Sequence, residues 1–456
     1  MKAGKTVISI VGLGYVGLCT AATFASQGIK IIGIDIDRKK VDQIREGKAP
    51  VHEPKLDRMI KTAVMKRRFQ VSDDISLASG SDIIFLTVGT PSQNDGSADL
   101  TYLKSATTSV GSALKQKDEY HLVVVKSTVV PGTTNRVVKP ILEELSGKKV
   151  GVGLGLCANP EFLKEGTAIE DALHPDRIVI GSNDQKAIRE LTGLYRRFYG
   201  SRTPPIFVMS PDSAELVKYA SNAFLATKVS FINTIANFAE RTPNVDVGVV
   251  AEAIGSDPRI GKLFLQAGPG YGGSCFHKDL QALIQYGHKL GYNASLFSAT
   301  EETNDKQAER VVEIAEELLG SLSGKRICVL GLAFKKDTDD IREAASLKVI
   351  NRLNEKGARV VAYDPMAISN TKRQLGDSID YSDNTLNAIN GADLAITMTE
   401  WDTIRRLKAK DFRERMSSPN VLDARRIYDP KAFKEMRYVA IGLGDTNSQH
   451  GTRPVS

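Results

Sequence analysis

Cysteine is scarce in this sequence of 456 residues: there are four, and no two of them form a Cys-x-x-Cys pair. That scarcity excludes a disulfide framework and a cysteine zinc site, and it favours a reduced, cytoplasmic setting. Cys19, Cys157 and Cys328 fall in apolar stretches that suit a helix start and two strands, so we expect them to fill cores. Only Cys275 lies in a polar loop. We expect no metal site.

Long apolar runs and aromatic residues are also few. No run approaches the ~20 residues that span a bilayer. The apolar run after Lys2 and Lys5 is broken by Gly12, Gly14 and Gly17, which favours a strand, turn and helix over a signal peptide. Aromatic residues make up 6%, with no basic run between them, so we expect neither nucleic-acid nor membrane binding. The net charge of +7 is spread along the chain; it suits an anionic small substrate and equally a solvated surface.

The first 35 residues carry a dinucleotide-binding pattern. A β-branched run at 6–11 precedes Gly12-x-Gly14-x-x-Gly17, and an alanine-rich helix and a second strand ending in Asp35 follow. The glycines permit a tight turn and close approach to a pyrophosphate, which would rest on the helix N-terminus. Asp35 would accept from a ribose 2′-hydroxyl and repel a 2′-phosphate, so NAD is favoured. The neighbouring cations Arg38, Lys39 and Lys40 leave NADP open.

Further α/β alternation follows this pattern. Predicted strands at 82–88, 122–126 and 150–158 lead to Thr90, Thr128 and Glu161. Ligands of parallel sheets bind beyond the carboxyl ends of the strands, so these side chains are expected to face the site, although each also suits a cap or turn.

A long helix is predicted from Ser210-Pro211-Asp212 to about Arg241. Its apolar residues lie nearly all round it, so we expect it to be buried against more than one partner. It would link two nucleotide-type domains and form a dimer interface. Lys218 and Asn222 lie four residues apart on one face; a lysine there is more often simply solvated.

The opening arrangement recurs in the C-terminal part. After helices at 278–290 and 298–319, the pattern predicts a strand at 326–330, a helix at 341–356 and a strand at 359–363 before Asp364. Lys335, Lys336 and three acids replace the glycines of the first turn, so we expect a different ligand there. We therefore predict two Rossmann-like doubly wound α/β domains joined by a long central helix and a helical dimerisation region. The predicted boundaries are 1–208, 209–320 and 321–456, with a mobile tail from Gly442.

The glycine-rich loop at 268–273 leads to Cys275 and a helix whose first turn carries Lys278 and Asp279. So many glycines indicate a tightly bent backbone close to something large. A thiol at a helix N-terminus beside a lysine tends toward the nucleophilic thiolate, and Asp279 is placed as a partner or base. The alternative is a glycine-rich turn followed by a buried cysteine.

These stretches together resemble the UDP-glucose/GDP-mannose dehydrogenase family over most of the chain. The ordered matches are Gly12 to Gly17, Lys126-Ser127-Thr128, Asn159 to Leu163, Lys218 to Asn222, Arg259-Ile260-Gly261, Gly270 to Asp279, Phe334 to Thr338, and Asp423-Ala424-Arg425. Family members that act on UDP-N-acetylmannosamine carry a histidine before the cysteine and lack the Lys-Asp pair. Here Ser274 precedes Cys275 and Lys278-Asp279 follow, which indicates a hexose without the acetamido group. His277 replaces a more usual proline or glutamine, and we expect no consequence for the chemistry.

The resemblance implies oxidation of UDP-glucose at C6 to a carboxylate by two NAD⁺, through a thiohemiacetal and a thioester on Cys275. It assigns oxyanion stabilisation to Lys218 and Asn222, proton transfer through water to Asp279, and the hydrolytic water to Thr128 and Glu161. The implied cofactor contacts are Gly12, Gly14, Tyr15, Val16, Gly17, Asp35, Lys40, Thr90, Thr128, Glu165, Lys278 and Arg342. The implied substrate contacts are Glu161, Phe162, Leu163, Lys218, Asn222, Arg259 from a neighbouring subunit, Phe264, Gly270, Tyr271, Gly272, Gly273, Phe334, Lys335 and Arg425, the last two on the nucleotide part.

Two alternatives stay open. One is the same chemistry on GDP-mannose or another nucleotide sugar. The other is a non-catalytic regulator that binds NAD and a nucleotide sugar, against which the presence of Cys275, Lys218 and Asp279 argues. A homodimer or higher homo-oligomer is expected in either case.

Overall fold

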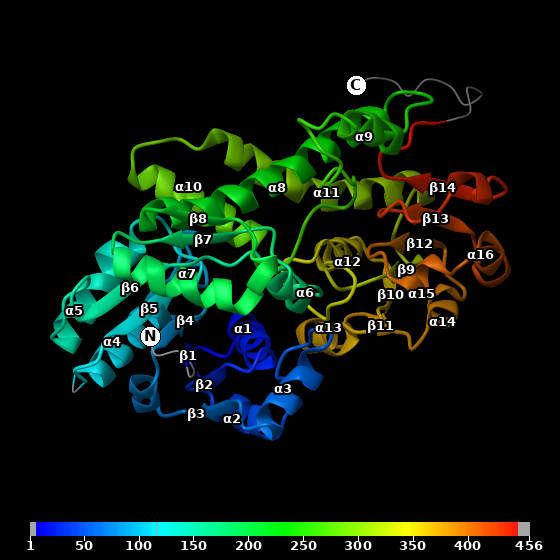
Figure 1. Ribbon diagram of the computed structural model, residues 1–456. Helices are drawn as coiled ribbons and strands as arrows, with labels where there is room; N and C mark the ends of the chain where they lie inside the picture. Colours follow the sequence, from blue (N-terminus) through cyan, green and yellow to red (C-terminus); the bar gives the residue numbers. More distant parts are fainter. Residues whose placement is uncertain (1–5, 116, 446–456) are drawn as a thin grey trace. The chain divides into compact units, whose positions relative to one another are not determined.

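The computed structural model describes residues 6–115 and 117–445, which divide into two compact units (Figure 1). Within that part of the chain, the first unit comprises residues 6–221 and 281–290, and the second comprises 222–280 and 291–445. Helices α8 (Pro211–Ala239) and α10 (Phe276–Lys289) each contribute residues to both units.

The first unit is built on an eight-stranded sheet in the order β3-β2-β1-β4-β5-β6-β7-β8. The first six strands of that order are parallel, which is the arrangement typical of dinucleotide-binding domains, and β7 pairs with β6 antiparallel. The strands are β1 (Val7–Val11), β2 (Lys30–Ile34), β3 (Phe69–Ser72), β4 (Ile83–Leu86), β5 (His121–Val125), β6 (Leu154–Ala158), β7 (Ile178–Gly181) and β8 (Ile206–Met209).

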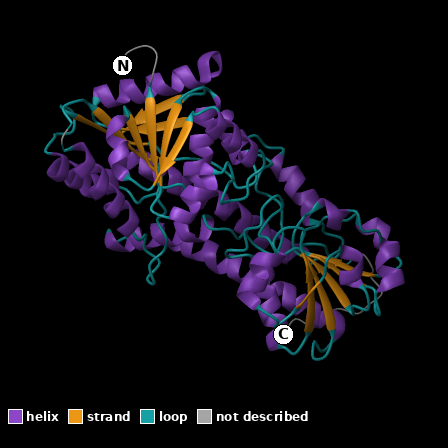
Figure 2. Ribbon diagram, turned by 90° about the horizontal axis from the view of Figure 1, so that it is seen from below, coloured by secondary structure: helices purple, strands orange, loops and turns teal. Residues whose placement is uncertain are grey.

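Helices cover both faces of this sheet, as Figures 1 and 2 show. One core packs β-strand residues against α1, α3, α6 and α7, and a second core on the opposite face packs them against α4 and α5. The strands are apolar on both sides for this reason. The helices are α1 (Tyr15–Ser26), α2 (Arg38–Arg45), α3 (Leu56–Met65), α4 (Thr101–Leu114), α5 (Lys139–Ser146), α6 (Ala168–Leu173) and α7 (Gln185–Tyr199), with short turns η1 (Ile75–Gly80), η2 (Thr134–Val138) and η3 (Gly200–Arg202).

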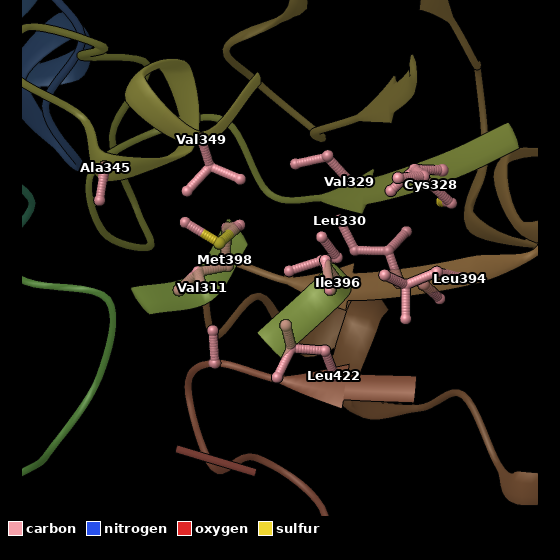
Figure 3. Close-up of a cluster of buried hydrophobic side chains, with 14 of the residues drawn as sticks. Val311, Cys328, Val329, Leu330, Ala345, Val349, Leu394, Ile396, Met398 and Leu422 are labelled. Atoms are coloured by element: carbon pink, nitrogen blue, oxygen red, sulfur yellow. The ribbon is translucent and has the colours of Figure 1, made fainter. Parts of the chain in front are cut away.

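The second unit contains a six-stranded, all-parallel sheet in the order β11-β10-β9-β12-β13-β14. Its strands are β9 (Arg326–Leu330), β10 (Arg359–Tyr363), β11 (Asp380–Tyr381), β12 (Leu394–Thr397), β13 (Asn420–Asp423) and β14 (Arg437–Ala440). The helices of this unit are α9 (Val247–Gly255), α11 (Ser295–Leu319), α12 (Ala345–Glu355), α13 (Ile368–Leu375), α14 (Thr385–Ile389), α15 (Asp402–Arg405) and α16 (Ala409–Arg415), with η4 (Pro430–Phe433). Figure 3 shows Val311 of α11 and Val349 of α12 in the same buried cluster as strand residues such as Val329 and Ile396. The predicted second Rossmann-like sheet is therefore confirmed.

The starts of one strand and one helix were predicted well before their observed positions. The strand expected at 150–158 begins at Leu154, because Gly151 takes a left-handed φ of 91° in a turn that its N–H closes on the Leu154 carbonyl. The helix expected at 341–356 begins at Ala345, because Glu343 has a φ of 50°, which an α-helix cannot contain. In both cases neither the number of glycines nor the spacing of apolar residues revealed the turn that delays the start of the element.

The C-terminal segment is held in place as far as the structure describes it. The Gly442 N–H donates to Glu240 at 2.9 Å, and the Gly444 N–H donates to the Val245 carbonyl at 2.8 Å. The predicted mobile tail from Gly442 is therefore wrong for residues 442–445, while residues 446–456 lie outside the described part.

Helix α8 is not buried all round within this chain. Phe224, Phe231 and Phe238 have exposed fractions of 66%, 51% and 66%. They are spaced by seven residues, so they share one side of the helix.

Among the described residues, no helix is long and apolar enough to cross a membrane.

Candidate active site

The turn between β1 and α1 is shaped by three glycines in different environments. Gly12 has a φ of 97°, and a Cβ at Gly17 would lie 2.0 Å from the Gly12 carbonyl oxygen. At Gly14 a Cβ would meet nothing within 4 Å, so the surface there is open for a ligand to approach the backbone. The first turn of α1 contains no acid that would repel an anion. These features fit a dinucleotide pyrophosphate.

Asp35 lies at the end of β2 and is fixed by backbone donors. Its Oδ2 accepts from the Leu13 N–H at 2.7 Å, and its Oδ1 accepts from the Asp37 N–H at 3.0 Å. The carboxylate is thus held beside the turn, where the sequence placed it. Two neighbouring cations pair with other acids: Arg38 with Asp73 at 2.8 Å and Lys40 with Asp37 at 3.9 Å.

The ends of β4 and β5 meet, as predicted. The Thr90 hydroxyl donates to the Thr128 carbonyl at 2.7 Å, and the Ser127 hydroxyl donates to the Val88 carbonyl at 2.7 Å. Thr128 also lines a small pocket together with Glu215 and Lys218. The structure therefore brings Thr90 and Thr128 together beyond the carboxyl ends of these strands.

Glu161 and Lys218 form a buried ion pair in the first unit. The Lys218 Nζ lies 2.9 Å from the Glu161 Oε1, and their side chains are 6% and 8% exposed. The Leu163 N–H donates to the Glu161 Oε2 at 2.6 Å. The structure thus brings together three predicted site residues.

A second buried lysine, Lys126 at the end of β5, belongs to the same cluster. Its Nζ donates to the Asn159 Oδ1 at 3.2 Å, and that oxygen also accepts from the Tyr195 hydroxyl. Burial lowers the pKa of Lys126 to about 8, with Lys218 adding to this effect and Glu161 opposing it. Burial alone would raise the pKa of Glu161, but Lys218, the Leu163 N–H and Lys126 outweigh it, so that pKa lies below its ordinary value.

Sequence reasoning did not assign a role to Lys126, although its motif was recognised. A charged residue at the end of an apolar strand was the available signal.

Two buried glutamates were missed without such a signal. Glu215 on α8 accepts from the Gly132 and Thr134 N–H groups at 2.6 and 2.7 Å, and burial raises its pKa to about 7. Glu53 accepts from the Tyr15 hydroxyl and from the Gly166 N–H.

Three further predicted residues of the first unit are Phe162, Val16 and Glu165. The ring of Phe162 is stacked under the Arg177 guanidinium at 3.9 Å and lies 5.7 Å from the Lys218 Nζ. Val16 lies in the first turn of α1, and Glu165 is half-buried in the loop after β6.

The glycine-rich loop of the second unit is in close contact with its surroundings. A Cβ at Gly272 would lie 2.4 Å from the Glu343 carbonyl oxygen, and one at Gly273 would lie 2.9 Å from the Phe334 ring. Gly270 has a φ of 102°, and a Cβ there would lie 2.8 Å from the Asn304 side chain. The loop therefore cannot carry side chains at these positions, which explains the sequence pattern.

Cys275 is exposed and directly precedes α10, whereas Cys19, Cys157 and Cys328 are buried, as predicted. In the first turn of α10, Asp279 is buried and accepts from the Asn222 side chain at 2.6 Å. The Lys278 Nζ donates to the same carboxylate at 2.6 Å. The structure thus joins Asn222, Lys278 and Asp279 in one network next to the cysteine in the chain.

The residues predicted to hold a nucleotide also meet in the second unit. The Arg425 guanidinium donates to the Met398 and Phe334 carbonyls at 2.8 and 3.0 Å. The Lys335 Nζ lies 5.4 Å from the centre of the Phe334 ring. Phe334 therefore links the glycine loop to the cations Lys335 and Arg425.

Three further predicted residues remain, and one of them joins the glycine-rich loop through its backbone, because the Gly273 N–H donates to the Arg342 carbonyl at 2.8 Å. Arg259 is 88% exposed at its side chain and pairs with its neighbour Asp257. Arg342 pairs with Asp340 at 2.6 Å. Phe264 packs 6.2 Å from Phe276, measured between ring centres.

Among the described residues, no group of three or more His, Cys, Asp or Glu side chains could hold a metal ion.

The fold, the glycine turn and the buried Lys-Glu pair define a nucleotide-dependent oxidoreductase. Models of three domains of the UDP-glucose/GDP-mannose dehydrogenase family match the chain: the NAD binding domain over residues 6–199, the central domain over 212–306 and the UDP binding domain over 328–430. The chain belongs to this family, and NAD is its cofactor.

Individual relatives agree with this assignment. The UDP-glucose 6-dehydrogenase AglM of Haloferax volcanii is 44% identical over 92% of this chain and 96% of the relative. The UDP-glucose dehydrogenase of Pyrobaculum islandicum has a solved structure with a TM-score of 0.89 and 39% identity, covering 97% of this chain and 99% of that one. The UDP-D-ManNAc dehydrogenase of Pyrococcus horikoshii is similar with a TM-score of 0.86 and 28% identity over 96% of this chain and 100% of that one. Relatives of different sugar specificity thus share the fold.

Proposed function

We propose that this chain is a UDP-glucose 6-dehydrogenase that oxidises the C6 alcohol of UDP-glucose to the carboxylate of UDP-glucuronate. The observation that carries the proposal is the position of Cys275, which is exposed at the start of α10 and follows a loop whose glycines are required by close contacts. Ser274 before the cysteine and Lys278-Asp279 after it favour UDP-glucose over an acetamido sugar. The names of the relatives support the same substrate.

The chain holds its cofactor and its substrate on different sheets in this proposal. Gly12, Gly14, Gly17 and Asp35 bind NAD, and the chemistry that NAD⁺ supplies when bound is acceptance of a hydride. The cations Lys335 and Arg425 bind the nucleotide part of the substrate. The division into domains at 1–208, 209–320 and 321–456 is part of the same proposal.

In the first half of the reaction, the C6 alcohol loses its hydroxyl proton to water and a hydride that NAD⁺ would accept. Lys218 and Asn222 donate to the oxygen of C6, where negative charge develops as the alcohol becomes an aldehyde. The ammonium of Lys218 is held by Glu161, and the amide of Asn222 is held by Asp279. These second contacts fix each donor in orientation before the charge appears.

In the second half, the Cys275 thiolate adds to the aldehyde carbon. A C6–S bond forms, and the aldehyde oxygen takes a proton, which Asp279 helps to move through water. The thiohemiacetal then loses its hydroxyl proton to water and a hydride from C6, which a second NAD⁺ would accept, and a thioester is left. Thr128 and Glu161 position the water that cleaves the C6–S bond and returns the thiolate. Glu161 is suited to this because its neighbours keep it charged.

A second copy of the chain is also part of the proposal. The exposed side of α8 that carries Phe224, Phe231 and Phe238 is apolar, and burial of such a face in a homodimer would remove it from water.

The function is tested by counting products. Wild type should form two NADH per UDP-glucose consumed, and Cys275→Ala should form no UDP-glucuronate because no thioester can arise. Acid formed by Cys275→Ala at a rate near that of wild type would contradict the covalent route. GDP-mannose and UDP-N-acetylmannosamine tested alongside decide the substrate, and no NADH with any nucleotide sugar would indicate a binding protein without activity.

A further inference from the structure

The buried carboxylate of Glu301, on α11, contacts the chain on both sides of Cys275. Its Oε1 accepts a hydrogen bond from the hydroxyl of Tyr271, four residues before the cysteine. Its Oε2 pairs with Nδ1 of His277, two residues after the cysteine. The side chains of Glu301 and His277 are 6% and 35% exposed. One acid therefore ties together the two ends of the segment that carries the thiol.

The same face of α11 also holds the backbone of the loop. The Asn304 Oδ1 accepts from the Tyr271 N–H at 2.7 Å, and its Nδ2 donates to the Tyr271 carbonyl at 3.1 Å. Gln307 donates to the Gly268 carbonyl at 3.1 Å. Glu301, Asn304 and Gln307 are spaced by three residues, so they line one side of the helix. These amides do not titrate, which leaves Glu301 with His277 as the contact that pH can change.

A buried carboxylate is unfavourable unless its charge is compensated. With His277 charged, Glu301 has an ion pair and a tyrosine hydroxyl. When His277 loses its proton, a hydrogen bond from the neutral ring can remain, but the attraction between the opposite charges is lost. The contact on the His277 side of the loop then weakens, while the contact with Tyr271 stays.

Other charges around His277 come from α11, from α12 and from the segment before α12. Glu343 favours the charged imidazole, and Lys348 opposes it. Lys348 is itself paired with Asp305 at 3.0 Å and with Glu343 at 3.4 Å. The hydrogen bond to Glu301 is the largest influence and raises the pKa of His277, while burial opposes the rise. The contribution of the pair to stability is therefore complete below the ordinary histidine value and is lost as the pH rises through the raised pKa.

We propose that Glu301, His277 and Tyr271 form a clasp on the Cys275 loop, closed when His277 is charged and loosened when it is neutral. His277 is a positioning residue: it acts on the reaction through the loop and not by contact with the substrate. The link to catalysis rests on the proposed role of Cys275. The clasp itself does not depend on that role, because it consists of contacts between the loop and Glu301.

Hydrogen exchange of the loop tests the clasp without reference to activity. We would measure the exchange of a peptide covering 268–276 between pH 6 and 9, corrected for the intrinsic effect of pH on exchange. In wild type the protection should fall by about threefold as His277 loses its proton. His277→Lys, which stays charged, should keep the low-pH protection throughout, and His277→Gln, which is never charged, should show the lower protection at every pH. His288→Gln changes an exposed histidine on the same helix and should behave as wild type.

A pH-dependent loss of protection in His277→Gln equal to that of wild type would overturn the clasp, as would identical protection in all variants. The catalytic arm uses the full enzyme with saturating NAD⁺ and varied UDP-glucose, so that kcat and KM are both obtained. As the pH rises, kcat of His277→Lys should exceed that of wild type by a growing factor of up to about three, with KM unchanged. If wild type forms no NADH, the proposed function fails while the exchange measurement still decides the clasp.

Discussion

At the scale of single residues, glycine has different roles at neighbouring positions of one turn. Gly17 lacks a side chain because the turn itself leaves no space: its Cβ would lie 2.0 Å from a backbone oxygen. Gly14 has an ordinary φ of −73° and no protein atom within 4 Å of its Cβ position. The fold therefore does not require glycine at 14, and we propose that the reason for it is a ligand that approaches the backbone.

This difference predicts opposite effects of two alanine substitutions. Gly14→Ala should leave the melting temperature within about 2 °C of wild type but weaken NAD binding by about tenfold or more, because the added methyl meets the pyrophosphate. Gly17→Ala should lower the melting temperature by several degrees, because the turn must shift to make room. Differential scanning fluorimetry and calorimetric titration with NAD⁺ measure both quantities. Equal NAD affinity in Gly14→Ala and wild type would contradict the assignment of the turn.

At the scale of elements, α8 has two sides of different character. Its inner side carries polar groups of the candidate site, Lys218 and Asn222, and both are buried. Its outer side carries the three phenylalanines at intervals of seven residues, all more than half exposed. A single helix can present both because positions four and seven apart fall on defined faces.

The exposed side predicts a dimer that one charge would disrupt. Phe231→Glu, in the middle of the three, should shift the protein from a dimer to a monomer of 49.6 kDa, because a carboxylate buried against an apolar partner face has no counter-charge. Light scattering after size exclusion gives the mass. Met65→Glu on α3 is the matched control, since Met65 is 75% exposed and lies away from α8 in the sequence. A dimer that persists in Phe231→Glu would place the interface elsewhere.

Elements with strong local signals could be predicted from the sequence, and elements decided by tertiary contacts could not. The run to Val11 and the strand at 359–363 were correctly placed because β-branched residues and glycine turns are local features. The helix start at Ala345 was missed because Glu343 has a positive φ at the point where its carbonyl lies close to Gly272, a residue distant in the sequence. Lys126 carried a local signal, a charge at the end of an apolar strand, but the same limit applies to Glu301, whose burial depends on residues far along the chain.

At the scale of the whole molecule, the proposed reaction needs groups from both sheets and from a second copy. The first sheet carries the NAD turn, and the second sheet carries the cations Lys335 and Arg425. Arg259 is exposed in the single chain, where its partner is Asp257. We propose that this arginine enters the substrate site of a neighbouring subunit, and its exposure in the single chain leaves it accessible for that role.

The contribution of Arg259 across a dimer can be tested by complementation. Arg259→Ala and Cys275→Ala should each be nearly inactive as homodimers. In a mixed dimer, the subunit that keeps Cys275 receives the intact Arg259 from its partner, so one of the two sites is complete. Random assembly makes about half of the dimers mixed, so co-expression should restore roughly a quarter of wild-type activity. If Arg259 acted within its own chain, neither site of a mixed dimer would be complete, and no activity would return. Tagging the two variants differently and purifying through both tags confirms that mixed dimers are present, and an inactive doubly tagged sample would therefore assign Arg259 to its own chain or to a place outside the site.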